Sequence, residues 1–291
     1  MKRQPATAYD GPTVSGIDVS HWQGEIDWAR VAASGQRFAI VRTGDGKDTD
    51  RTAVRNLIDA HGVGLLTGVY HYIRATHGAE VNLGVIREVL RVAAVPVGMV
   101  AIDVEGAPGK GSREASGAWM GGVSTAAVLE CVREMGEALE RDGQRAVIYS
   151  GVAWHWHVSQ AERGNHLAER YPLWTPYYTH RDRPSVPVYS DGSAAWDPEW
   201  TIWQHAGSGK VPGSVPGIDG NVDLNRWRGD EAALARWWDP GHRSTPPAPK
   251  PAPFDRSEIE ALAMRAAAAD DKPAALALIA ALDGLAKSPP L

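Results

Sequence analysis

The stretch Met99-Val-Ala-Ile-Asp-Val-Glu-Gly106 is apolar except for two carboxylates close to its end. Its continuous apolar run predicts a strand buried on both faces, as strands are in a parallel sheet covered by helices. Side chains alternate along a strand, so Asp103 and Glu105 point the same way, with Cα atoms roughly 6.6 Å apart. The stretch therefore predicts two neighbouring acids at the carboxyl end of a core strand, where α/β folds hold their active sites.

Two carboxyl groups this close cannot both ionise at low cost. One of them is expected to keep its proton well above its ordinary pKa, which is what an acid catalyst near neutral pH requires. A metal site, a salt bridge or an ordinary strand end is an alternative interpretation of this segment taken alone.

Strand and helix patterns alternate along the chain on both sides of this stretch. Besides 99–106, strands are predicted at 14–20, 38–42, 64–72, 146–150, 173–178, 200–205 and 220–225. Helices are predicted at 27–31, 51–61, 79–93, 124–142, 160–168 and 231–238. Alternation indicates parallel strands with helical crossovers, and eight strands favour a closed barrel. The last three strands lack full helices between them, so the predicted fold is α/β, an irregular TIM-like (β/α)5β3 barrel.

The barrel is expected to occupy residues 1–243. A proline-rich segment, 244–254, then predicts a stiff linker. Residues 255–291 have the pattern of two short Ala/Leu helices, a small C-terminal appendage expected to serve assembly of several copies or wall targeting. Assembly is favoured slightly, because the appendage lacks the aromatic residues that sugar binding uses.

Composition excludes several classes of function. The chain has 291 residues and a net charge of −5, which gives no reason to expect a nucleic-acid partner. No apolar run is long enough to insert into a membrane. A single cysteine, Cys131, and the absence of a His-Glu-x-x-His motif argue against a metal site, and no cofactor is predicted. Residues 1–15 are polar and unlike a signal peptide, so synthesis and folding are expected in a cytoplasm.

Acidic residues end three separate strands of the predicted barrel and should meet at one mouth. They are Asp18, Asp103, Glu105 and Asp223. Neighbouring strand-end positions add candidate substrate-binding residues: Arg42, Tyr70, His71, Tyr72, Tyr149, Trp174, Tyr178, Trp203 and Gln204. Carboxylates walled by aromatic side chains are what glycoside cleavage needs, because one acid protonates the leaving oxygen and the others stabilise positive charge at the sugar.

Several of these residues also have structural interpretations. His71 is nearly as well explained as a hydrogen-bonded barrel histidine. Arg42 could form an ion pair with Asp18 or Asp103, and we expect it to serve both purposes. The three aromatic residues Tyr149, Trp174 and Trp203 could belong to the core, although their strand-end positions favour the cleft.

The chain resembles the lysozymes of glycoside hydrolase family 25, also called Chalaropsis-type muramidases. The matching pieces are Gly16-Ile-Asp-Val-Ser-His-Trp-Gln-Gly24 with Ile26-Asp-Trp28, Gly68-Val-Tyr-His-Tyr72, Ala101-Ile-Asp-Val-Glu105, Leu173-Trp174, Trp203-Gln204 and Asn221-Val-Asp-Leu-Asn225. Their order and spacing hold over roughly residues 15–227. The resemblance implies a flattened barrel that cleaves the β-1,4 bond between N-acetylmuramic acid and N-acetylglucosamine in bacterial peptidoglycan.

Carried over by position, Glu105 would be the general acid and Asp103 would assist attack by the substrate's 2-acetamido group. Asp18 and Asp223 would complete an acidic floor. An inverting route through water remains open, with Asp18 or Asp223 as the base at about 6.5–9.5 Å from the acid. The loop 106–123 and the excursion 180–199 do not match the pattern, and both are expected to shape the sugar subsites.

Many family members of this size are phage endolysins, and a missing signal peptide fits that group. The enzyme would then be made in the host cytoplasm and act on the wall after release. Two other classes are weighed against this hypothesis. One is a chitinase-like hydrolase of N-acetylhexosaminides, and the other is a wall glycan-binding protein without activity, against which the intact Asp103 and Glu105 argue.

Overall fold

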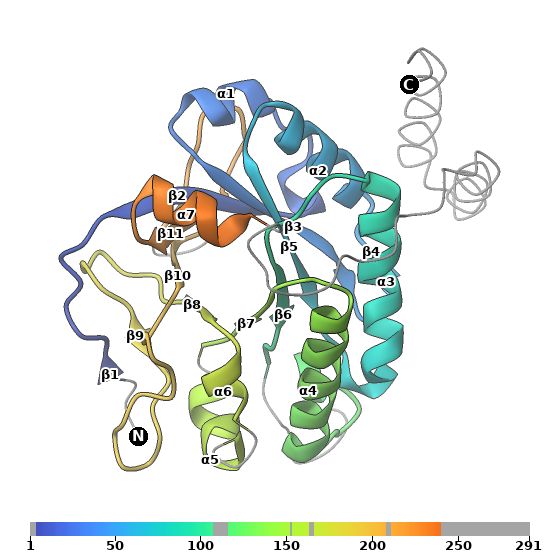
Figure 1. Cartoon of the computed structure of the whole chain (residues 1–291), viewed down its shortest axis with the longest axis vertical. Coiled ribbons are helices and arrows are strands. Elements are labelled where there is room, and N and C mark those ends of the chain that lie inside the picture. The colour runs from blue at the N-terminus through green and yellow to red at the C-terminus, as the bar shows by residue number, and fades with distance from the viewer. Residues whose placement is uncertain (1–3, 107–115, 152, 163–165, 208–210, 240–291) are drawn as a thin grey trace.

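A closed ring of eight strands forms the centre of the molecule, which we describe from a computed structural model (Figure 1). The structure describes residues 4–106, 116–151, 153–162, 166–207 and 211–239. The strands of the ring are β2 (Thr13–Val19), β3 (Phe38–Asp45), β5 (Leu66–Tyr72), β6 (Val100–Asp103), β7 (Ala146–Tyr149), β8 (Leu173–Pro176), β10 (Ile202–Ala206) and β11 (Asp223–Arg228). A short strand, β4 (Asp48–Thr49), pairs with the end of β3 outside the ring.

Strand direction follows the prediction over most of the ring. The six neighbouring pairs from β2 through β3, β5, β6, β7 and β8 to β10 are parallel. The last strand, β11, runs antiparallel to both β10 and β2 and closes the barrel between them. The predicted (β/α)5β3 barrel is therefore confirmed, including its irregular side.

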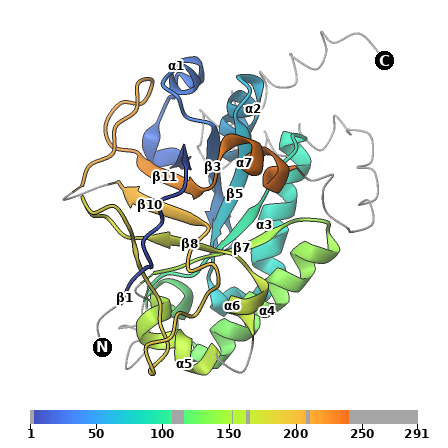
Figure 2. The same ribbon diagram turned by 60° about the vertical axis from the view of Figure 1, so that its left-hand side comes forward.

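Helices cover the outer face of the parallel part of the barrel (Figures 1 and 2). They are α1 (Trp28–Ala33), α2 (Ala53–Gly62), α3 (Gly78–Ala93), α4 (Thr125–Arg141), a π-helical turn (Trp154–Val158), α5 (Ser159–Glu162) and α6 (Leu167–Arg170). Their starts agree with the capping chemistry of the sequence, since Asp27 and Ser124 accept hydrogen bonds from the backbone N–H groups of Arg30 and Ala127.

The alternation of side chains divides the core into two layers. On β6, Val100, Ile102 and Val104 pack outward among the helices, whereas Ala101 points into the barrel. The interior is apolar at the amino ends of the strands and becomes polar at their carboxyl ends, where Asp103 follows Ala101 on the same face. This change of polarity along each strand is what places a site at one mouth of the barrel.

Helix α7 (Glu231–Trp238) closes the opposite mouth. Its last residue, Trp238, packs on Phe38 with ring centroids 5.1 Å apart, and its indole N–H donates to the Thr67 carbonyl at 2.7 Å. Gly98 makes room for this ring, because a Cβ at that position would lie 1.9 Å from Cδ1 of Trp238. The end of the barrel interior opposite the polar mouth is therefore covered by Trp238.

The excursion 180–199 packs against the amino-terminal segment. Strand β1 (Gln4–Pro5) pairs antiparallel with β9 (Ser185–Val186), and the Thr7 backbone N–H donates to Glu199 Oε2 at 2.6 Å. Among the described residues, no helix combines the length and apolar character that crossing a membrane requires. The predicted linker 244–254 and appendage 255–291 lie outside the described residues.

Candidate active site

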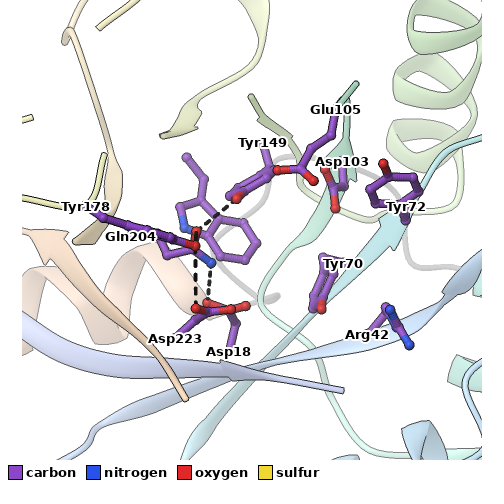
Figure 3. Close-up of a pocket in the computed structure, with 11 residues that line it drawn as sticks. Asp18, Arg42, Tyr70, Tyr72, Asp103, Glu105, Tyr149, Tyr178, Gln204 and Asp223 are labelled. Carbon is purple, nitrogen blue, oxygen red and sulfur yellow. Dashed lines mark hydrogen bonds between the residues drawn. The ribbon is translucent and has the colours of Figure 1, made fainter. Parts of the chain in front are cut away.

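A pocket of about 220 Å³ opens at the carboxyl ends of the barrel strands (Figure 3). It is lined by eleven of the thirteen residues predicted for the site: Asp18, Arg42, Tyr70, Tyr72, Asp103, Glu105, Tyr149, Trp174, Tyr178, Gln204 and Asp223. The four acids form two pairs on opposite sides of the pocket, with the aromatic rings between them.

Asp103 and Glu105 form the first pair, at the end of β6. Their side chains lie beside each other, as the alternation of the strand predicts (Figure 3). The backbone is fixed on both sides of Val104, whose N–H donates to the Tyr149 carbonyl at 2.9 Å and whose carbonyl accepts from Ser150 Oγ at 2.8 Å. The two carboxyl groups are thus held by the neighbouring strand rather than by a loop.

Burial is the main electrostatic influence on this pair. It raises the pKa of Asp103 well above the ordinary value, and the charge of Glu105 raises that pKa further. Burial also raises the pKa of Glu105, which a hydrogen bond with Tyr149 partly opposes. Asp103 Oδ1 is buried and has no hydrogen-bond partner among the described residues. The pKa values of both carboxyl groups are therefore raised, and one buried oxygen of the pair lacks a hydrogen-bond partner within the described part of the protein.

Asp18 and Asp223 form the second pair and come from the first and last strands of the ring, β2 and β11. They are direct partners in the register between β2 and β11. Burial, and next the charge of Asp223, raises the pKa of Asp18 well above its usual range. Burial raises the pKa of Asp223 to about 6, partly opposed by the Tyr178 hydroxyl, which lies 3.5 Å from Asp223 Oδ1.

Amide side chains fix the orientation of Asp18. Gln204 Nε2 and Asn225 Nδ2 donate to Asp18 Oδ2 at 2.9 and 2.7 Å. The Asn225 amide cannot be reversed, because its Oδ1 accepts a 2.8 Å hydrogen bond from the indole of Trp174, which can only donate. Hydroxyl groups of Tyr149 and Tyr178 donate to Gln204 Oε1, each at 2.9 Å. Asp18 Oδ2 is therefore held as an acceptor.

Arg42 reaches the pocket but is anchored outside it. Its Nε donates to Asp50 Oδ2 at 2.8 Å, so the expected ion pair with Asp18 or Asp103 is corrected. Although burial alone would raise the pKa of Asp50, backbone N–H groups of Thr52 and His21 together with Arg42 lower it. An ionised Asp50 thus holds the guanidinium in place beside the acids.

Arg74 supports the aromatic wall on the other side. Its guanidinium lies 4.8 Å from the ring centre of Tyr72 and pairs with both carboxylate oxygens of Asp45, at 2.5 and 2.7 Å. Arg74 Nη1 also donates to the Gly117 carbonyl at 3.3 Å. The wall is therefore tied to the segment that follows Glu105.

Two predicted substrate-binding residues lie outside the pocket. His71 is fully buried, with Nδ1 2.9 Å from Thr43 Oγ1 and Nε2 3.0 Å from the Gly46 carbonyl oxygen, and burial lowers its pKa to about 4. Trp203 is buried against Trp200, and its indole donates to the Tyr177 carbonyl at 3.0 Å. Both predictions are corrected for the same reason, because successive side chains of a strand face opposite sides.

The same alternation could have identified a residue that we did not predict. Asn225 follows Asp223 by two positions on β11 and so faces the same side. The anchors Asp50, Asp45 and Arg74 carried no comparable signal, because their roles depend on contacts between segments distant in the sequence.

Comparison with known proteins agrees with this geometry. A protein named lysozyme M1 from Streptomyces globisporus is 29% identical over 236 residues, covering 77% of this chain and 71% of that protein. The uncharacterised protein YegX of Escherichia coli is 32% identical over 241 residues, covering 80% and 76%. The crystal structure of a bacterial lysozyme from Streptomyces coelicolor, 25% identical, superposes with a TM-score of 0.61 over 80% of this chain and 100% of that one.

The model of the family "Glycosyl hydrolases family 25" matches residues 17–214, which include the end of β2, the barrel strands from β3 to β10 and three of the four pocket acids. The chain belongs to glycoside hydrolase family 25.

Proposed function

We propose that this glycoside hydrolase is an N-acetylmuramidase, which cleaves the β-1,4 bond between N-acetylmuramic acid and N-acetylglucosamine in bacterial peptidoglycan. The observation that carries the proposal is the placement of Asp103 and Glu105 side by side in a pocket that also presents Asp18 and Asp223. Family membership and the similarity to a protein named lysozyme M1 support the substrate class.

Glu105 is proposed as the general acid. Burial raises the pKa of its carboxyl group, which is the direction that a proton donor near neutral pH requires. That proton passes to the oxygen that links the two sugars while the bond from this oxygen to the anomeric carbon breaks. The leaving sugar departs with a neutral hydroxyl group.

Asp103 is proposed to orient the substrate's 2-acetamido group. Asp103 lines the pocket, and its carboxylate can accept a hydrogen bond from the N–H of that group, which would strengthen the carbonyl oxygen as a nucleophile. That oxygen bonds to the anomeric carbon as the leaving oxygen departs. Water, deprotonated by Glu105, then opens the resulting ring and retains the anomeric configuration.

Asp18 and Asp223 are proposed to stabilise positive charge at the sugar and to position water. The inverting alternative assigns one of them as the base for direct attack by water. The anomeric configuration of the first product, followed by NMR, separates these routes. Release of the β-anomer supports the acetamide route, and release of the α-anomer supports inversion.

Analysis of new reducing ends in digested cell walls tests the reaction, the bond and the substrate together. We expect new muramic acid ends. New glucosamine ends, or soluble fragments from chitin, would instead support the chitinase-like hydrolase. Tight wall binding without any new ends would support the non-catalytic binding protein.

The Glu105→Gln variant tests the assignment of the acid. Replacing the carboxyl group with an amide of similar shape should reduce kcat by about 10²–10⁴-fold or more, because the leaving oxygen then departs unprotonated. Circular dichroism and denaturation should show an unchanged fold. Wild-type activity in this variant would contradict the assignment.

We also propose that the enzyme is a phage endolysin, made in the host cytoplasm and acting on the wall after release. The polar segment around β1 packs on the barrel through β9 and Glu199, which supports its being part of the folded enzyme. Expression inside bacteria should leave cells intact until the membrane is permeabilised, and turbidity should then fall. Lysis without permeabilisation would contradict this role.

A further inference from the structure

The turn after β2 exposes one large aromatic side chain. Trp22 is 77% exposed, whereas the other tryptophans whose side chains the structure describes are buried or partly buried. Isolated apolar residues at a surface are common, so exposure alone does not indicate a site. The position of Trp22 and the contacts that hold its turn do indicate a site.

Trp22 belongs to a 3₁₀ turn, His21–Gln23, that connects two walls of the pocket. On one side, His21 Nδ1 lies 2.5 Å from an Nη2 atom of Arg42, which lines the pocket. On the other side, Gln23 Nε2 donates to the Asn221 carbonyl at 3.2 Å, two residues before Asp223. The turn that carries Trp22 therefore lies between Arg42 on one side and the segment leading to Asp223 on the other, and both of these residues line the pocket.

The turn is fixed by hydrogen bonds from both directions. The Trp22 backbone N–H donates to Ser20 Oγ at 3.3 Å, and the Ser20 N–H donates to Gln23 Oε1 at 2.9 Å. The His21 N–H donates to the buried Asp50 at 3.0 Å. The indole also rests on the His21 imidazole, with ring centroids 4.4 Å apart and planes at 35°. The indole therefore contacts the imidazole on one side, and the backbone that carries it is held in place.

We propose that the open face of Trp22 binds a further N-acetylhexosamine ring of the glycan strand, beyond the two sugars whose bond is cleaved. The inference rests on the proposed function, since it names an additional subsite of the same groove. A pyranose presents a face of C–H groups bordered by hydroxyl and amide groups, and an indole offers a matching flat apolar surface with one N–H donor. Trp22 is a binding residue and takes no part in bond cleavage.

The subsite is tested by binding to the full-length Glu105→Gln chain, which should hold glycan without cleaving it. The probes are the peptidoglycan disaccharide and longer oligosaccharides of the same repeat. Adding Trp22→Ala should weaken binding of the longer chains roughly tenfold, as expected for losing one buried aromatic face. Binding of the disaccharide should not change.

Two further variants serve as controls. Trp22→Tyr retains a flat ring and should restore most of the affinity for long chains. Ile58→Ala removes another exposed apolar side chain, on the outer helix α2, and should leave both affinities unchanged. In the parent variant, long chains should also protect indole fluorescence from acrylamide, and this protection should disappear with Trp22→Ala.

Several outcomes would overturn the subsite. The affinity for long chains could be unchanged in Trp22→Ala, or Trp22→Tyr could lose as much of that affinity as Trp22→Ala. Trp22→Ala could also weaken binding of the disaccharide as much as that of long chains, which would indicate disturbance of Arg42 through His21. Failure of the proposed function is recognised separately, because the wild-type enzyme would then generate no muramic acid ends. That result would remove the subsite as well.

Discussion

Burial of Asp223 in the pocket acts against the stability of the folded chain. Burial raises the pKa of this carboxyl group from its ordinary 3.8 to about 6, so the folded chain binds a proton that the unfolded chain releases between these values. Stability falls with rising pH wherever the folded state binds more protons. Asp223 therefore lowers the free energy of unfolding as pH rises from about 4 to about 6, and the loss persists above that range.

The Asp223→Asn variant should remove this contribution. We expect it to be more stable than the wild type at pH 7, with the difference vanishing below the ordinary pKa of 3.8. Urea denaturation across this range measures the effect. Asp219→Asn replaces an exposed carboxylate near β11 and should show no such gain. A wild type that remains as stable as Asp223→Asn throughout would contradict the prediction.

Asp50 contributes with the opposite sign. Its pKa is lowered in the folded chain, so the stability it contributes is present above the ordinary pKa and is lost as pH falls through the lowered value. Acid unfolding therefore includes protonation of this anchor. Arg42 and the turn carrying His21 would lose their common partner in the same step.

At the scale of elements, the segment after β6 holds Glu105 by close backbone packing. Gly117 has a φ of +58°, and a Cβ there would lie 2.2 Å from the Glu105 carbonyl oxygen. The same oxygen accepts a hydrogen bond from the Ala118 N–H at 3.0 Å. The position of the proposed acid thus depends on a glycine that is distant from it in the sequence.

Gly117→Ala should therefore displace Glu105 and lower kcat/KM by about 10²-fold, the effect of a small misplacement of a catalytic group. Gly143→Ala is the matched control, because that glycine also has a positive φ, +73°, but a Cβ there meets no atom within 4 Å. Both variants should lose stability through backbone strain, and Gly117→Ala should lose more because of the added clash with the Glu105 backbone. Equal activity in the two would refute the packing argument.

The elements also show what the sequence could predict. The strand carrying Asp103 and Glu105 was identified because its apolar pattern and its acids occur together in a short stretch. His71 and Trp203 were misassigned because strand ends were treated as facing the pocket on both sides, although Tyr70 and Tyr72 already occupied the inner face beside His71. Asp50 could not be predicted, because its partners Arg42 and His21 meet it only after β2 and β3 pair.

At the scale of the whole molecule, the barrel is closed at its lower mouth by one side chain. Trp238→Ala should destabilise the protein by about 3–5 kcal/mol, since it removes a buried indole packed on Phe38 and Gly98. Trp237→Ala, at the partly buried neighbouring position, should cost less. Denaturant midpoints measure the stability of the two variants. Equal losses of stability would show that Trp238 does not have the special packing role assigned to it.

The predicted appendage is tested by truncation after residue 243, which retains α7. The shortened chain should cleave soluble peptidoglycan fragments as fast as the full chain, because all pocket residues lie before this point. Either its oligomeric state in solution or its binding to whole cell walls should differ from that of the full chain. A shortened chain that fails to fold would show that residues beyond 243 belong to the barrel core.

The pairing of Asp18 with Asp223 links activity to the order of synthesis. The first of these acids emerges from the ribosome early, and its partner leaves the exit tunnel only when nearly the whole barrel has been translated. The two amide side chains that donate hydrogen bonds to Asp18, those of Gln204 and Asn225, are also synthesised late. A nascent chain, or a fragment cut before the last strand, therefore carries Glu105 without the opposite wall of the pocket, and we expect it to be inactive until β11 has joined the barrel.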